Sequence, residues 1–125
     1  MAVTYATDVK KDRMDAVTTQ IDAGTGAGYL EIGTTSMASV LATITLNDPA
    51  APAAVGGVLT FTMPQSDTSA DATGTAAEAR IRDSDANDVI TGLTVGTAAT
   101  DIILDSVSIT AGQTVTINSA TITHA

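Results

Sequence analysis

The alternation of side-chain types over residues 77–82 constrains the fold of this chain more than any other feature. Small or apolar residues alternate there with charged ones: Ala77, Glu78, Ala79, Arg80, Ile81 and Arg82. Because successive side chains of a strand point to opposite faces, this pattern predicts a strand with one buried and one solvated face. Turn-forming residues fill 83–88, and an apolar, β-branched run occupies 89–95. Together the two runs predict a hairpin.

The same criteria predict a second hairpin near the C-terminal end. Residues 102–109 form its first strand, a turn follows at 110–113 where Gly112 can adopt a positive φ, and residues 114–117 return. The apolar phase then shifts from odd to even positions, which predicts a β-bulge near 118–119 before a final strand over 120–123.

The first half of the chain contains the remaining predicted strands. They cover 29–32, 40–46 and 58–63, and the last two end where proline interrupts a ladder, at Pro49 and Pro64. Along them, one predicted buried face consists of Val40, Ala42, Ile44 and Leu46, and another of Leu59, Phe61 and Met63. The polar, small residues of 65–73 predict a mobile surface loop.

Residues 4–22 have the spacing of a helix. Tyr5 and Val9 are four residues apart, and the apolar residues Met14, Val17 and Ile21 recur at intervals of three and four. Thr4 or Thr7 can cap the start, and Gly24 follows the end, as helix-terminating glycines do. The charged face formed by Lys10, Lys11 and Arg13 is expected to be solvated.

Length and composition define the fold class. The 125 residues are expected to form a single domain over 1–125, with a helix at 4–22 and strands within 29–123. With two tyrosines, one phenylalanine and no tryptophan, the core must be thin and aliphatic, and a large ligand cavity is disfavoured. We predict a mainly β protein, a single β-sandwich with jelly-roll or immunoglobulin-like wiring and one N-terminal α-helix.

Net charge, the lack of a long apolar run and the lack of cysteine each disfavour a class of function or site. Fourteen acidic residues against five basic ones give a net charge of -9, which disfavours binding to nucleic acid. No run approaches the roughly 18 apolar residues of a membrane span, so we expect a soluble product made in the cytoplasm with no membrane partner. The absence of cysteine rules out a disulfide framework and a thiolate metal site.

The turn at 83–88 resembles the opening of a calcium-binding EF-hand loop, because Asp83, Asp85 and Asn87 place oxygen atoms at alternate positions. The resemblance then fails. Asp88 stands where that loop needs glycine, and Thr94 stands where it needs a bidentate glutamate. We therefore expect a solvated turn and no metal site.

The sequence lacks the side chains needed for a recognisable catalytic site. His124 is the only histidine, and Asp101 and Asp105 are more typical of two exposed acids than of a catalytic pair. The glycine-rich stretch 24–28 follows a helix and precedes a strand, the reverse of a nucleotide-binding loop. We expect no enzymatic activity and no cofactor. Few aromatic residues are present to stack on sugars, so a carbohydrate-binding module is a less favoured alternative.

Motifs along nearly the whole chain resemble those of small proteins encoded in tailed bacteriophages and prophages. The motifs lie at residues 4–7, 13–16, 28–32, 41–49, 72–76, 79–81 and 112–123. The resemblance implies a virion component, specifically a capsid decoration or cement protein that binds the outer head shell. Its implied partners are the major capsid protein and copies of itself, as a dimer or trimer. A head-tail connector, neck or tail-associated component is the alternative.

Within that hypothesis, the basic cluster of Lys10, Lys11 and Arg13 is expected to contact an acidic shell. Two open sheet edges, the loops and the N-terminal helix are expected to supply the remaining contacts. The helix can pack on its own sandwich, which we slightly favour, or lie on the shell.

Overall fold

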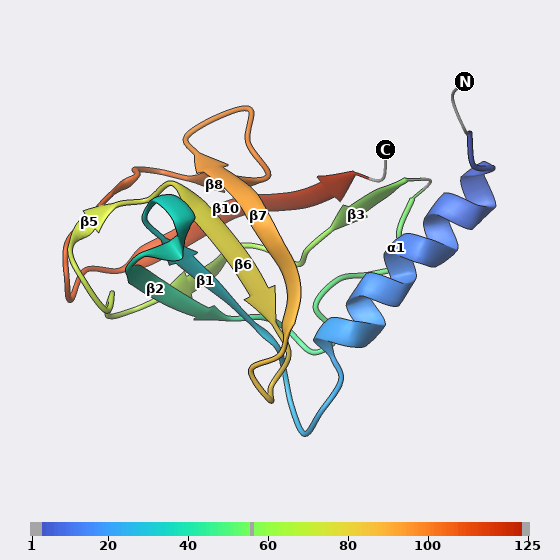
Figure 1. The fold of residues 1–125 in the computed structure, drawn as a ribbon, viewed down its shortest axis with the longest axis horizontal. Coiled ribbons are helices and arrows are strands. Elements are labelled where there is room, and N and C mark those ends of the chain that lie inside the picture. The colour runs from blue at the N-terminus through green and yellow to red at the C-terminus, as the bar shows by residue number, and fades with distance from the viewer. Residues whose placement is uncertain (1–3, 56, 124–125) are drawn as a thin grey trace.

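The computed structural model describes residues 4–55 and 57–123 (Figure 1). The protein is mainly β, with a strongly curled sheet and one α-helix, which confirms the predicted fold class. A short 3-10 turn, η1 (Thr35–Met37), was not predicted. In chain order, the helix and strands are α1 (Thr7–Ile21), β1 (Tyr29–Gly33), β2 (Val40–Thr45), β3 (Val58–Thr60), β4 (Gln65–Asp67), β5 (Gly74–Thr75), β6 (Glu78–Arg82), β7 (Asp88–Gly96), β8 (Ile102–Leu104), β9 (Ser108–Ile109) and β10 (Val115–Thr123).

The main sheet has eight strands in the order β2-β1-β6-β7-β8-β10-β3, and β4 pairs with β10 as well. Its neighbours are antiparallel, except that β7 and β8 are parallel. β5 and β9 form a separate two-stranded ladder. The main sheet curls until β2 lies next to β4, where the backbone N–H of Thr43 donates to the Asp67 carboxylate at 3.0 Å. The curl encloses the core that the strands share.

The predicted central hairpin is confirmed. β6 pairs with β7, with Ile81 opposite Ile90, and on its other side β6 pairs with β1, with Ile81 opposite Leu30. Ala79 and Ile81 are fully buried, whereas Arg80 on the other face remains partly exposed. The alternation in the sequence therefore specified which face of this central strand is buried.

The predicted second hairpin differs from the structure in one respect. The predicted strand 102–109 is broken, because the Ser106 hydroxyl accepts a hydrogen bond from the Ser108 N–H at 3.1 Å and turns the chain. As a result β8 pairs with β10, whereas β9 pairs with β5. β10 is continuous, and its register shifts between Ile117 and Ser119, so the predicted bulge is confirmed.

The prediction of a loop at 65–73 was wrong for residues 65–67, which form β4, whereas residues 68–73 have no regular secondary structure, as predicted. Residues of β4 pair with β10, although their side chains contribute nothing to the core. Further along, the N–H of Asp71 donates to the Leu41 carbonyl at 2.7 Å, so this segment also occupies the outer edge of β2. One of the two expected open sheet edges, that of β2, is therefore partly occupied by the chain itself. A polar strand without an apolar face gives no periodic signal.

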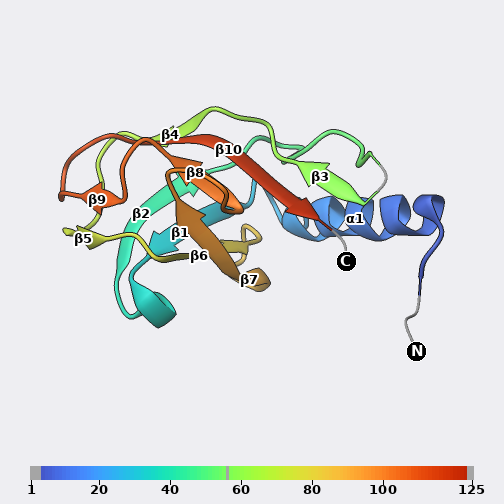
Figure 2. The same cartoon turned by 90° about the horizontal axis from the view of Figure 1, so that it is seen from above.

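Helix α1 packs on its own sheet, against β3 and β7. Met14 and Ile21 are buried, and Val17 packs against the core. The predicted caps are wrong, because the helix starts at Thr7 after Ala6 and has no side-chain cap. Its N-terminal half extends past the sheet (Figure 2). Such a 15-residue helix is about 22 Å long, and only its C-terminal part meets the core.

The core is aliphatic, as the composition predicted. Phe61 is the one aromatic among its largest fully buried side chains within the described residues, and the others are isoleucine or leucine. Ala42 and Ile44 are buried as predicted, but Leu41 on the opposite face of β2 is buried too. Residues 70–76 cover Leu41, so β2 has buried side chains on both of its faces at that point.

Candidate functional site

The candidate site is an exposed end of the molecule that we call the helix tip, comprising residues 5–13 and the described part of the turn 54–58. A loop brings these segments together. The Ala54 N–H donates to the Asp15 carboxylate at 2.7 Å, and the Ala50 N–H donates to the Asp22 carboxylate at 3.1 Å. Asp15 and Asp22 are two helical turns apart on one side of α1, so the loop follows the helix. Figures 1 and 2 show the start of β3 beside the helix.

The helix tip gathers exposed apolar side chains. Four large hydrophobic residues are exposed among those described, and all of them belong to the tip: Tyr5 at 41%, Val9 at 43%, Val55 at 81% and Val58 at 39%. Single exposed apolar residues are ordinary, but their occurrence together at one end of the molecule makes this end a candidate interaction surface. Tyr5 and Val9 belonged to the predicted helical pattern, but Tyr5 precedes α1 and both side chains are exposed.

The predicted basic cluster also lies in the tip, but its three side chains have different surroundings. Lys11 forms an ion pair with Asp15 at 2.7 Å, and this hydrogen bond raises the pKa of Lys11. The Arg13 guanidinium lies over the Tyr5 ring, 4.6 Å from its centroid. Lys10 is partly buried. Because consecutive helical residues are about 100° apart, Lys10 and Arg13 share one side of the helix and Lys11 lies on another.

Charge is distributed unevenly between the tip and the rest of the molecule. α1 contains three of the fourteen acidic residues and three of the five basic ones, so the helix is neutral. The other residues carry eleven acids against two bases, which is the whole net charge of -9. The protein therefore consists of an acidic body and a neutral helix with both signs of charge.

The two bases of the body are engaged in ion pairs on the outer face of β1, β6 and β7. Arg80 contacts Glu31 at 2.6 Å, and Arg82 contacts Asp88 at 2.7 Å and Glu31 at 3.5 Å. Hydrogen bonds from the Arg82 guanidinium to Tyr29 and Asp88 hold the pKa of Arg82 above its ordinary value. These pairs leave no compact basic patch on the body among the described residues.

Asp83 anchors the turn that resembles an EF-hand opening. Its carboxylate accepts hydrogen bonds from the N–H of Asn87 at 2.9 Å and of Asp85 at 3.0 Å, and from the Asn87 side chain at 3.1 Å. The Asn87 donors lower the pKa of Asp83 most. The carboxylate is thus used to hold the turn closed. Across residues 4–55 and 57–123, no three His, Cys, Asp or Glu side chains are placed to share a metal ion.

The other predicted site candidates have structural roles or lie outside the described residues. Asp101 accepts hydrogen bonds from the N–H and hydroxyl of Thr94, each at 3.0 Å. Asp105 accepts one from the Asn118 side chain at 2.5 Å. The structure thus gives the two acids separate partners. His124 lies outside the described residues.

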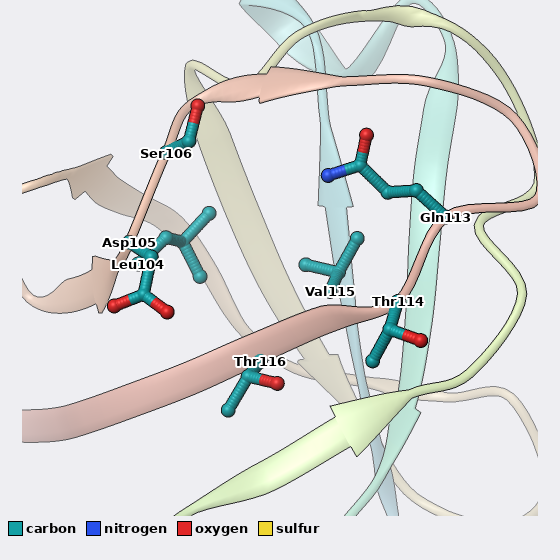
Figure 3. A pocket seen from close by; sticks show the side chains of 7 residues that line it. All are labelled: Leu104, Asp105, Ser106, Gln113, Thr114, Val115 and Thr116. Atoms are coloured by element: carbon teal, nitrogen blue, oxygen red, sulfur yellow. The ribbon is translucent and has the colours of Figure 1, made fainter.

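The surface of the described residues includes two hollows. The first, about 80 Å³, lies between residues 104–106 and 113–116, with Ser106 and Gln113 on opposite sides (Figure 3). The second, about 280 Å³, is an open hollow between the loop 49–53 and α1, where the Thr18 hydroxyl is buried without a hydrogen-bond partner in the described structure. Neither hollow contains a recognisable catalytic constellation.

Sequence reasoning identified Lys10, Lys11 and Arg13 but missed the apolar part of the tip. Val55 is a lone large residue in a stretch of alanine, proline and glycine, and that isolation was an available signal. The seven-residue spacing of Asp15 and Asp22 was another, although nothing in the sequence names the loop that they bind.

No helix in the described part of the chain is long and apolar enough to cross a membrane. Comparisons with protein families, curated proteins and solved structures found no match for this chain.

Proposed function

We propose that this protein is a non-enzymatic structural component of a bacteriophage virion, a capsid decoration or cement protein that binds and stabilises the outer head shell. The motifs that resemble small phage and prophage proteins support this proposal. The observation that carries it is the gathering of the exposed large hydrophobic residues and three of the five bases at one end of a compact acidic body. Such a molecule is suited to attachment at that end. It would be made in the host cytoplasm and reside on the capsid surface.

The partners in this proposal are the major capsid protein and further copies of the chain, as a dimer or trimer. Attachment would bury the helix tip, with Lys10, Lys11 and Arg13 meeting acidic groups of a partner. The acidic body would face solvent, where its charge of -9 keeps particles apart and soluble. Neither nucleic acid nor membrane is part of the proposed function.

A connector, neck or tail role uses the same attachment surface and is separated from the capsid role by stoichiometry. The carbohydrate-binding alternative receives less support from the aromatic residues. Phe61 is buried, Tyr5 is stacked by Arg13, and Tyr29 is hydrogen-bonded to Arg82. No open aromatic platform for a sugar ring results among the described residues.

The test compares purified heads with and without this protein. Deleting its gene is expected to lower the resistance of the heads to heat and osmotic shock, and quantitative mass spectrometry is expected to find a copy number on the scale of the shell proteins. Adding back wild-type protein is expected to restore resistance. A small, fixed copy number with unchanged head resistance and a lost tail would reject the cement role and support the neck or tail alternative.

A further inference from the structure

We propose that the helix tip is the surface through which one copy of this chain binds a second copy. This inference deepens the proposed function, on which it rests for its biological setting, by naming the occupant of the tip. The contact itself belongs to the isolated chain and can be tested without a capsid.

The first observation concerns the exposed apolar side chains of the helix tip. Val9 is 43% exposed and Val55 is 81% exposed, on segments that the Asp15–Ala54 hydrogen bond holds together. The body offers no comparable surface among its described residues, because its other large hydrophobic side chains are buried or partly buried. Association driven by apolar burial would therefore use the tip.

The second step is electrostatic and identifies the occupant. Two bodies that each carry the full charge of -9 repel one another, so copies can approach closely only where the local charge is balanced. The neutral helix provides such a place. Asp8 and Asp12 lie on one side of it, and Lys10 and Arg13 lie on the other. A contact between identical surfaces needs both signs of charge on each surface, and the tip has them.

The third step concerns the helix itself. Residues 5–13 are all described and none is buried, and the helix begins without a side-chain cap. A short helical segment with β-branched Thr7 and Val9 and no fully buried side chain is marginal in water. Burying its exposed face against a second copy would supply the missing stabilisation.

The sheet edges are poor alternatives for the same contact. The segment 67–72 occupies the edge of β2 through Asp67 and Asp71, and the turn before β3 closes on itself through mutual hydrogen bonds of Val55 and Val58, each at 3.0 Å. Backbone groups at these places already have partners, so strand addition there would break existing bonds. Lys11, which lies on a different side of the helix from Lys10 and Arg13, would remain for the shell.

The experiment is analytical ultracentrifugation of the full chain over a concentration series. Wild-type protein is expected to form a reversible dimer or trimer. Val9→Asp and Val55→Asp change exposed positions, so both are expected to fold and to weaken association by about tenfold or more. The matched control is Ala111→Asp, which adds the same charge in the exposed turn that follows β9. Figure 2 shows β9 at the end of the molecule away from α1, so this variant is expected to leave association near wild type.

Salt provides a second readout. Raising the sodium chloride concentration is expected to strengthen association, because it screens repulsion between acidic bodies more than it weakens a neutral, partly apolar contact. A wild-type chain that stays monomeric at every concentration would overturn the inference, as would equal association of the Val9→Asp and Ala111→Asp variants.

The two proposals fail in distinguishable ways. Monomeric protein that still binds heads, and loses that binding on Val9→Asp, would assign the tip to the shell and reject the copy–copy contact alone. Protein that associates through the tip but is absent from purified virions would reject the proposed function and retain the contact.

Discussion

Replacing Ile81 with alanine tests the register of the central hairpin. Ile81 is fully buried, and it lies between Leu30 of β1 and Ile90 of β7. The substitution removes roughly three methylene-sized groups, and at about 0.8 kcal/mol each the lost transfer free energy is about 2.4 kcal/mol. Because neighbours on paired strands cannot collapse fully into the space, the cavity raises the expected loss to about 3–4 kcal/mol.

The assay is urea unfolding followed by circular dichroism. A domain of this size has a free energy of unfolding of roughly 6–19 kcal/mol, so the Ile81→Ala variant is expected to fold and to unfold at a urea concentration lower by about 2 M. The control is Arg82→Ser on the solvated face of the same strand. Arg82 makes partly exposed ion pairs, so its loss is expected to cost at most about 1 kcal/mol.

Equal destabilisation by Ile81→Ala and Arg82→Ser would refute the register, because both residues would then lie in equivalent environments. Ile81→Asp extends the series. An unpaired carboxylate at this position costs several kcal/mol more than the cavity does, and we expect that variant not to fold.

Three further predictions follow from local geometry. Gly28→Ala is expected to lower the melting temperature strongly, because a Cβ there would lie 2.7 Å from the Arg82 carbonyl oxygen, whereas the control Gly26→Ala meets nothing within 4 Å and is expected to be mild. Burial raises the pKa of Asp22, so its ionised form opposes folding, and this cost disappears as the pH falls below the ordinary aspartate value of 3.8. Asp22→Asn is therefore expected to raise the melting temperature at pH 7 but not at pH 3, and a constant difference across that range would contradict the assignment. Asp83 already binds its own turn, so calcium at sub-millimolar concentration is expected to leave the melting temperature unchanged, and a rise of several degrees would show a site there.

The sequence predicted the elements whose own side chains carry the signal. Ile81 and its charged neighbours specified β6 and its inward face, and the shift of apolar phase after Ile117 specified the bulge in β10. Met14 and Ile21 specified the buried face of α1. In each case burial of one face selects the periodicity, so that the pattern is present within a few consecutive residues.

The candidate site was predictable only in part, for the same reason. The charges of Lys10, Lys11 and Arg13 are visible in the sequence, and so is the imbalance between a neutral helix and an acidic remainder. The exposure of Val9 and Val55 is not visible in the sequence, because a valine gives the same signal whether it is buried or exposed. Exposure depends on how far the sheet extends beneath the helix.

The tertiary structure alone decided features that depend on backbone partners distant in the chain. Residues of β4 became a strand because β10 offered unpaired N–H and C=O groups, and no apolar pattern in residues 65–67 announces that pairing. Likewise, the N–H groups of Ala50 and Ala54 bind the carboxylates of Asp22 and Asp15, and this holds the turn before β3 against the helix. Almost every residue type can form backbone hydrogen bonds, so these bonds leave no pattern in the sequence. The sequence therefore determines the strands that have a buried face, whereas long-range backbone pairing determines the polar strand β4 and the position of the turn before β3.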